Sequence, residues 1–240
     1  MAAKKIIFLT GCVNPKGMSK TVLQDPQKRK QQYIDAIRFY ISQTTLKILF
    51  VDNSNTDLSA YFLKEIDNKQ VEILTFEGNR YDKSLGKGYG ECELLEYAFR
   101  NSTFMNDADY IIKITGRLCV NNIRELITSM KKLDTVYAQR IRMDGMSCLS
   151  YFFGSPKSFL LEYFLPLKGN INDELGVYFE HVLYRAVLSW KINGRKFKEF
   201  YLPIQLMGQS GSTGKEYKPR KIDYFLALLK YVYHNTPFYK

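Results

Sequence analysis

This chain of 240 residues contains little histidine and no closely spaced cysteines. Its two histidines, His181 and His234, are too few and too far apart for a zinc motif. The four cysteines form no C-x-x-C pair, which argues against both disulfides and structural zinc. The chain has no apolar run of about 18 residues, and the segment from Met1 to Thr10 lacks a signal-peptide cleavage pattern. The sequence therefore predicts a cytoplasmic protein.

Acidic residues are also comparatively few. The chain has 24 Asp and Glu residues against 35 Lys and Arg residues, which gives a net charge of +11. This excess predicts an acidic partner, such as a nucleotide, a nucleic acid or an anionic membrane surface. The hydrophobic share of 45% is ordinary for a globular protein, and the length suits one domain with a full core.

Short β-branched runs alternate with amphipathic stretches through the first 135 residues. The predicted strands are residues 5–9, 47–51, 71–76 and 110–114, and the predicted helices are 25–42, 91–99 and 123–133. Asp25 followed by Pro26 is typical of a helix start. This alternation predicts an α/β domain with a mainly parallel sheet flanked by helices. Ligands bind at the carboxyl edge of such sheets, where each predicted strand ends in a polar loop.

The second half of the sequence is less regular. We expect a strand over 136–141, an aromatic stretch at 151–153, a long helix over 173–190, a strand over 196–201 and a Gly/Ser loop at 208–214. A basic, aromatic tail follows the loop. We divide the chain into a domain over residues 1–207 and a C-terminal extension over 208–240, within one globular unit.

Several short segments at strand ends and helix starts occur in a characteristic order. They are Thr10-Gly11-Cys12-Val13-Asn14-Pro15, Asp52-Asn53-Ser54, Glu77-Gly78-Asn79, Gly86-Lys87-Gly88-Tyr89-Gly90, the stretch from Ala108 to Arg117, Phe179-Glu180-His181, and Gly194. Together they resemble the nucleotide-sugar-binding part of GT-A-fold glycosyltransferases over roughly residues 5–205. They look most similar to bacterial transferases of capsule and lipopolysaccharide synthesis. The resemblance implies a GT-A-like, Rossmann-type sheet with a C-terminal helical extension.

The sequence departs from that family at one position. Thr115-Gly116-Arg117 stands where the family carries an Asp-x-Asp motif, which holds the divalent ion that neutralises the leaving nucleoside diphosphate. Arginine and lysine can stabilise the same charge through charge-assisted hydrogen bonds. We therefore expect no metal ion and no cofactor. Arg117 and the basic residues that follow the Gly/Ser loop, Lys215, Lys218, Arg220 and Lys221, are expected to act in place of the metal.

The resemblance also implies roles for particular residues. In an inverting enzyme Glu180 or His181 would take the acceptor proton, with Asp173 and Glu174 as fallback bases, whereas a retaining enzyme needs neither. The predicted catalytic residues are Glu180, His181 and Arg117. The predicted nucleotide-sugar contacts are Thr10, Gly11, Asn14, Asp52, Asn53, Lys87, Gly88, Thr115, Gly116, Arg117, Ser210, Ser212, Thr213 and Lys215.

Each of these signals has a simpler interpretation. The glycines of residues 86–90 fit a surface turn. Asp52 and Asn53 are turn formers as readily as nucleoside contacts. Arg117 could pair with Asp107 or Asp109 at the surface. Glu180 could be a helix-surface residue, and His181 a buried core residue.

Two further features stay outside the predicted site. Lys113 lies inside a strand, and we interpret it as half of a structural ion pair. The stretch 222–234 fits a helix that packs on the core and equally a basic, aromatic helix at an anionic membrane surface. The second interpretation would place the protein at the inner face of the cell membrane.

The resemblance implies a metal-independent glycosyltransferase with a nucleotide-sugar donor and a glycan or lipid-linked acceptor. A nucleotidyltransferase acting on a sugar phosphate is the alternative enzyme, although it would ordinarily need acidic metal ligands. A basic nucleic-acid-binding module is the non-enzymatic alternative. No nucleic-acid-binding motif is present, so we expect no nucleic-acid partner.

Overall fold

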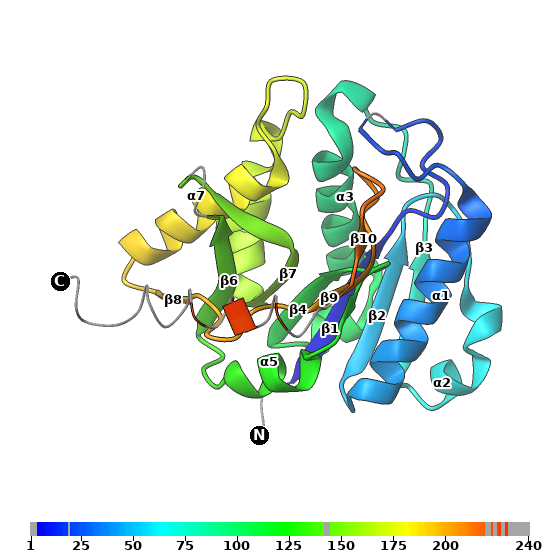
Figure 1. Cartoon of the computed structure of the whole chain (residues 1–240), viewed down its shortest axis with the longest axis horizontal. Coiled ribbons are helices and arrows are strands. Elements are labelled where there is room, and N and C mark those ends of the chain that lie inside the picture. Colours follow the sequence, from blue (N-terminus) through cyan, green and yellow to red (C-terminus); the bar gives the residue numbers. More distant parts are fainter. Residues whose placement is uncertain are drawn as a thin grey trace.

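A computed structural model describes residues 4–18, 20–141 and 145–218, and beyond them Ile222, Phe225, Leu226 and Leu229. Figure 1 shows a central sheet with helices packed on it. The strands are β1 (Lys5–Gly11), β2 (Lys47–Asp52), β3 (Val71–Thr75), β4 (Tyr110–Thr115), β5 (Cys119–Val120), β6 (Thr135–Ile141), β7 (Ser147–Pro156), β8 (Lys196–Lys198), β9 (Leu206–Gln209) and β10 (Glu216–Tyr217).

Helices connect most of these strands. The α-helices are α1 (Pro26–Gln43), α2 (Leu63–Asp67), α3 (Gly86–Asn101), α4 (Thr103–Asp107), α5 (Ile123–Ser129), α6 (Lys157–Phe159) and α7 (Phe179–Ile192). Shorter helical turns are η1 (Ser59–Tyr61), η2 (Lys83–Leu85), η3 (Leu160–Phe164) and η4 (Leu165–Asn170). None of the described helices combines the length and the apolar character needed to cross a membrane.

The main sheet has seven strands in the order β3-β2-β1-β4-β7-β6-β8. Every neighbouring pair is parallel except the two pairs that β7 makes with β4 and β6. A smaller sheet has the order β10-β9-β5. The predicted class, α/β with a mainly parallel sheet flanked by helices, is confirmed. The carboxyl ends of β1, β2 and β4 meet at one edge, where open α/β sheets bind ligands.

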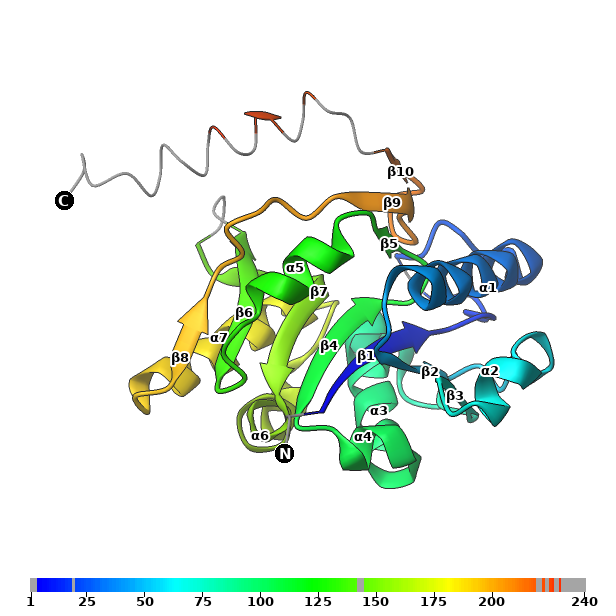
Figure 2. The same ribbon diagram turned by 90° about the horizontal axis from the view of Figure 1, so that it is seen from below.

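Side chains of β1 alternate between two hydrophobic cores. Ile6 and Phe8 pack with residues of α3 and α7, and Ile7 and Leu9 pack with residues of α1 and α5. Figure 2 shows α1 and α5 on one side of the sheet and α3 on the other. Because both faces are covered, the strand is hydrophobic throughout rather than alternating with polar residues.

The start of α1 follows the sequence signal. The Asp25 side chain accepts hydrogen bonds from the backbone N–H groups of Gln27 and Lys28 at 2.9 and 3.2 Å. Pro26 occupies the first helical position, where a missing N–H costs nothing. The four predicted strands of the first half are also present, with ends within two residues of the expected ones.

The start of α3 differs from the prediction. The helix begins at Gly86 rather than near Glu91, so the glycines belong to its first turns and not to a surface turn. Gly86 has a φ of +81°, which favours glycine. A Cβ on Gly86 would lie 2.1 Å from the Asp173 carboxylate, and one on Gly90 would lie 2.3 Å from the Tyr81 hydroxyl. Close packing explains these glycines.

The long helix of the second half also begins later than predicted, at Phe179 rather than Asp173. The Asn172 side chain accepts the backbone N–H groups of Glu174 and Leu175, which forms an Asx turn. A bridge between Asn172 and Val177 closes this turn, and Gly176 has a φ of +75°. The turn therefore competes with the helix over residues 172–177.

From α5 onward, the observed elements differ most from the predicted ones. α5 ends at Ser129 and β8 at Lys198, both earlier than expected, and the hairpin of β9 and β10 was not predicted. The helix predicted over 222–234 lies almost wholly outside the described residues. Its four described side chains, Ile222, Phe225, Leu226 and Leu229, are 50–63% exposed.

Candidate functional site

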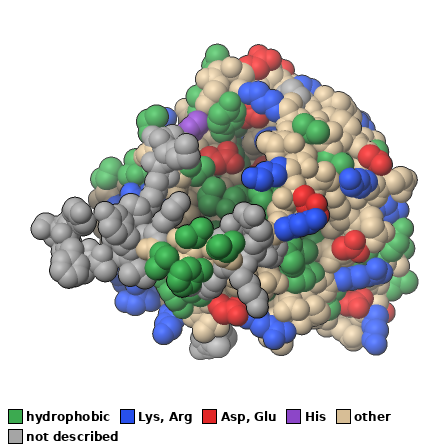
Figure 3. All heavy atoms as spheres, in the orientation of Figure 1, with side chains coloured by type: hydrophobic (Ala, Val, Ile, Leu, Met, Phe, Trp, Pro, Cys, Tyr) green, Lys and Arg blue, Asp and Glu red, His purple; other side chains and the backbone are tan. Residues whose placement is uncertain are grey.

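A cavity of about 290 Å³ opens at the carboxyl edge of the main sheet. Its walls come from the ends of β1 and β4, the start of α3, the start of α7 and the loop between β9 and β10. The space-filling view shows this face hollowed near its middle (Figure 3). The volume lies near the lower end of the range for small-molecule sites.

Most of the predicted site residues line this cavity. They are Thr10, Gly11, Asn53, Lys87, Gly88, Thr115, Arg117, Glu180, Ser210 and Ser212. The other predicted residues do not line it: Asn14, Asp52, Gly116, His181, Thr213 and Lys215. The structure thus brings together residues that are 200 positions apart in the sequence.

Asp52 is a turn former in the structure. Its carboxylate accepts hydrogen bonds from the N–H groups of Val13 and Ser54 at 2.7 and 2.8 Å, and from the Ser54 hydroxyl and the Thr56 N–H. Both carboxylate oxygens are therefore engaged, and Asp52 is fully buried. The prediction of a ligand contact has no geometric support here, because the side chain stabilises the loops that follow β1 and β2.

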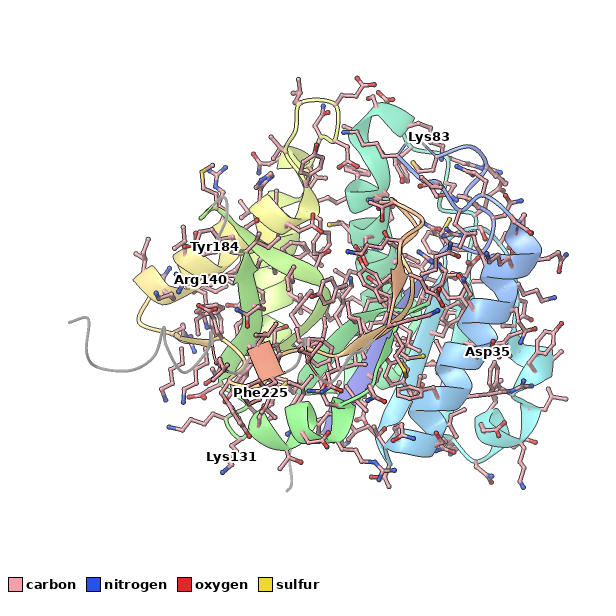
Figure 4. The ribbon with its side chains drawn as sticks, in the orientation of Figure 1. Asp35, Lys83, Lys131, Arg140, Tyr184 and Phe225 are labelled. Carbon is pink, nitrogen blue, oxygen red and sulfur yellow. The ribbon has the colours of Figure 1, made fainter. Side chains whose placement is uncertain are left out.

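Asn53 and Asn79 instead have buried polar atoms that lack a hydrogen-bond partner among the described residues. Both side chains are buried and line the cavity, and in the described structure the Oδ1 atom of each has no hydrogen-bond partner. Buried polar atoms are normally paired, so these unpaired atoms mark Asn53 and Asn79 as candidate ligand contacts. The backbone carbonyl oxygen of Asn79 accepts a hydrogen bond from the Lys83 ammonium, which lies beside the start of α3 (Figure 4). Asn79 was not among the predicted contacts.

Asn14 and Gly116 shape the edge of the site without lining it. The Asn14 N–H donates to the Ser54 hydroxyl at 2.9 Å, which joins the loops after β1 and β2. The Gly116 N–H donates to the Thr10 carbonyl at 2.9 Å, and a Cβ on Gly116 would lie 2.8 Å from that oxygen. Gly116 therefore allows the close approach of β1 and the end of β4.

Arg117 is buried at the end of β4, with only 8% of its surface exposed. Its Nη1 donates to the Gln209 carbonyl at 3.0 Å, and its guanidinium lies 5.9 Å from the centre of the Tyr33 ring. Its buried Nε has no partner within the described part of the chain. No salt bridge joins Arg117 to a carboxylate of the described residues, and Asp107 pairs with Lys4 instead. The interpretation of Arg117 as a surface ion pair is therefore wrong.

A second buried guanidinium, that of Arg29, also lines the cavity. Its Nε and Nη2 donate to the Cys12 carbonyl, and its Nη1 donates to the Leu23 carbonyl. It makes no salt bridge within the described part of the chain, so its charge is not neutralised by a carboxylate. This role was not predicted, because Arg29 belongs to a polar run at the start of α1 that looks solvent-exposed in the sequence.

The loop between β9 and β10 covers both guanidiniums. A Cβ on Gly211 would lie 2.4 Å from Nη2 of Arg117 and 3.6 Å from Nη1 of Arg29. The Gly211 carbonyl accepts the Val22 N–H at 2.8 Å, and the Ser212 hydroxyl accepts from the Lys87 ammonium. The predicted phosphate loop therefore closes over the cations. Thr213 and Lys215 are exposed on its outer side.

Asp173 lies against the start of α3. It is 3% exposed and lines the cavity, and its Oδ2 has no partner in the described structure. Burial raises the pKa of this carboxyl, and the positive charges of Lys87 and Lys20 oppose the rise. Glu174, the other fallback base, is exposed and does not line the cavity.

Glu180 and His181 are separated by the structure. Glu180 lines the cavity from the first turn of α7, and its Oε1 accepts a hydrogen bond from the Ser150 hydroxyl. His181 turns away: its Nδ1 accepts the Tyr178 backbone N–H at 3.1 Å, and its ring stacks on the Tyr178 ring. The structure therefore supports Glu180 as a site residue and gives His181 the role of a helix cap.

Comparisons with known proteins give matches to solved structures only. No protein-family model matches the chain, and no curated protein matches its sequence. Solved structures with a similar arrangement include the mannosyltransferase Ktr4p of S. cerevisiae, at 10% identity and a TM-score of 0.46, covering 85% of this chain and 70% of that one. TarS of S. aureus in complex with UDP gives 11% identity and a TM-score of 0.42, with 95% and 64% covered.

A third similar structure belongs to a different class of enzyme. It is the inositol-1-phosphate CTP transferase of T. maritima, at 9% identity and a TM-score of 0.42, with 83% of this chain and 86% of that one covered. At such low identities and scores, none of these similarities carries a functional argument.

Proposed function

We propose that this chain is a glycosyltransferase that transfers a sugar from a nucleotide-sugar donor to a hydroxyl group without a metal ion. The observation that carries the proposal is Arg117 at the end of β4 in the cavity wall. It is a buried guanidinium whose Nε has no partner, and which has no carboxylate partner, among the described residues. A buried cation without a counter-ion favours binding of an anion. The diphosphate of a nucleotide sugar is an anion that fits this chemistry.

The surroundings of Arg117 support a diphosphate at this position. Arg29 adds a second buried positive charge, and Lys87 adds a third charge at the start of α3. The Gly211 backbone passes directly over Arg117 and Arg29, so the loop can close on a bound anion. In the reaction, these cations would stabilise the negative charge that develops on the leaving diphosphate.

Glu180 is the acceptor base in this proposal. Glu180 lines the same cavity. An acceptor hydroxyl bound between Glu180 and the sugar carbon could transfer its proton to the Glu180 carboxylate while its oxygen attacks that carbon and the nucleoside diphosphate leaves. That arrangement describes an inverting transfer. A retaining transfer would need no such base, and substitution of Glu180 separates the two.

A nucleotidyltransferase is the second candidate. Such an enzyme ordinarily places acidic ligands around a metal ion. Among the described residues, no three His, Cys, Asp or Glu side chains gather in a group that could hold a metal ion. A nucleic-acid-binding module ranks third, because the residues with unpaired polar atoms include Asn53, Asn79 and Arg117, which line a cavity rather than an open surface.

The acceptor is proposed to be a bacterial surface glycan or a lipid-linked glycan. This part of the proposal follows the sequence resemblance. The C-terminal stretch that would favour an anionic membrane surface lies mostly outside the described residues, so membrane association stays a prediction. Adding lipid-linked glycans in anionic vesicles to the transfer reaction tests the acceptor.

Transfer is expected to continue when divalent ions are removed. UDP-, GDP-, CMP- and dTDP-sugars would be incubated separately with the protein in excess EDTA, and the released nucleotide measured. At least one sugar nucleotide should be turned over, at a rate that added manganese changes little, because Arg117 and Arg29 supply the positive charge. Activity abolished by EDTA and restored by manganese would contradict the metal-free mechanism.

A further inference from the structure

Lys113 is a fully buried lysine in the middle of β4. Its ammonium forms an ion pair with Glu91 of α3, as the sequence interpretation expected, and donates to the Ser150 carbonyl at 2.7 Å. It also lies 5.4 Å from the centre of the Phe179 ring, at the start of α7. One charge therefore links α3, β7 and α7. Burying an ammonium is unfavourable unless all its partners are in place, so Lys113 fixes them relative to one another.

The Ser150 carbonyl is available to Lys113 because β7 is bulged at this position. Ala138 of β6 pairs with Phe153 of β7, but Arg140, two residues further along β6, pairs with Cys148, five residues back along β7. Between these two pairs β7 has four residues, 149–152, where β6 has only Gln139, and Ser150 is among the four. Bulges interrupt the hydrogen-bond ladder and redirect side chains, and they are frequent beside active sites. Here Lys113 satisfies a carbonyl in the bulge.

The bulge directs the Ser150 hydroxyl to the proposed base. Ser150 Oγ donates to Glu180 Oε1, and both residues line the cavity. Glu91, the partner of Lys113, also accepts a hydrogen bond from the Thr10 hydroxyl at 2.8 Å, and Thr10 lines the cavity at the end of β1. A continuous chain of contacts thus runs from Thr10 through Glu91, Lys113 and Ser150 to Glu180.

We propose that Lys113, held by Glu91, is a positioning residue that acts through Ser150 to orient the Glu180 carboxylate toward the acceptor. This inference rests on the proposed function, which gives Glu180 its role. In this inference the ion pair of Lys113 and Glu91 fixes the bulge in β7, and the Ser150 hydroxyl in the bulge fixes the Glu180 carboxylate. A purely structural ion pair would affect stability but would not act on turnover through Glu180.

A double-mutant cycle between Ser150 and Glu180 tests the link. The assay measures nucleotide released from whichever of the UDP-, GDP-, CMP- and dTDP-sugars the parent turns over. Ser150→Ala removes the hydroxyl and keeps the carbonyl that Lys113 binds. It should lower kcat about ten- to a hundredfold, because misplacing a catalytic group by about 1 Å has effects of this size. The same change in a Glu180→Gln background should lower kcat no further, since the group that Ser150 orients is then absent.

The ion pair is tested by Lys113→Met, alone and combined with Glu91→Gln. The double variant removes both buried charges, so it should recover much of the lost stability, but kcat should stay low because the bulge carbonyl has lost its donor. Affinity for the nucleotide should be unchanged in all these variants. The matched control is Lys168→Met. Lys168 forms ion pairs with Glu93 and Glu96, which lie on α3 like Glu91, but it does not line the cavity. Its kcat should stay at the parental value.

The outcomes are distinct. If Ser150→Ala lowers kcat by the same factor with and without Glu180, or leaves kcat unchanged, the positioning role is wrong while the glycosyltransferase proposal stands. If the Lys113 and Glu91 double variant regains full kcat along with stability, the ion pair is only structural. If the parent releases nucleotide from none of the sugars, the proposed function fails and the positioning role fails with it.

Discussion

Replacing Arg117 by alanine is expected to slow turnover about a hundredfold while the protein stays folded. Arg117 is the cation best placed for the leaving diphosphate, being buried, unpaired with any carboxylate of the described residues and capped by the Gly211 backbone. Removing a preorganised charge of this kind costs on the order of 3 kcal/mol in the barrier, which is close to a hundredfold in rate. Both kcat and nucleotide affinity should be measured.

Two related substitutions test the geometry of this charge. Arg117→Lys should recover only part of the rate, because a point charge cannot reproduce the planar fork of a guanidinium. Lys215→Ala should have a much smaller effect, since Lys215 is exposed and outside the cavity lining. Arg124→Ala is the matched control: this exposed arginine donates to the Ser42 and Gln43 carbonyls far from the site. If Arg117→Ala kept the parental turnover and donor affinity, the role of Arg117 would be contradicted, and Thr115-Gly116-Arg117 would be only the structural end of a strand.

Glu180→Gln is expected to lower kcat about a hundredfold or more, with little change in nucleotide affinity. A positioned general base contributes roughly this factor, and glutamine keeps the shape of the side chain but cannot accept the proton. His181→Ala should keep a near-parental kcat, because His181 caps α7 and does not line the cavity. Its stability should fall slightly, since the Tyr178 N–H loses its acceptor.

Asp173→Asn separates the remaining alternatives for the base. Asp173 is a buried carboxylate that also lines the cavity, and burial raises its pKa. Loss of kcat in Asp173→Asn with parental kcat in Glu180→Gln would move the base to Asp173 and contradict the role of Glu180. Parental kcat in both variants would contradict an inverting mechanism with a carboxylate base.

The strands of the first half were predictable because both faces of the sheet are covered, so these strands are hydrophobic along most of their length. β1, β2 and β4 are runs of buried apolar residues that end in polar loops, so their position and the ligand edge could be read directly. The helix α1 was equally clear, since Asp25 and Pro26 mark its start. Local hydrophobic patterning and capping fix these elements.

Elements whose limits depend on distant contacts were not predictable. The glycines at the start of α3 look like a turn, and only the close approach of Asp173 and Tyr81 explains why Gly86 and Gly90 carry no side chain. The hairpin of β9 and β10 is short and polar, and it forms where Gly211 meets the loop before α1. Neither contact leaves a local pattern in the sequence.

In the candidate site, too, some residues could be predicted from the sequence and others could not. Arg117 and Glu180 could be predicted because they follow recognisable strand and helix positions. Arg29 and Glu91 could not, because a charged residue on a helix usually faces solvent, and only the packed structure shows that these two face the cavity. Asp52 had two possible roles, and its four hydrogen bonds show that it stabilises the turn.

Binding of a nucleotide without metal is the most direct test of the account, and thermal unfolding in excess EDTA measures it. UDP, GDP, CMP and dTDP would be compared with RNA and DNA oligomers. At about a hundredfold excess over Kd, a ligand adds ~2.7 kcal/mol of stability, and in a chain of this size each kcal/mol moves Tm by roughly 2–4 °C. We predict that at least one mononucleotide raises Tm by about 5–10 °C in the parent, less in Arg117→Ala, and that the oligomers do not. Stabilisation by the oligomers but by no mononucleotide would contradict the account.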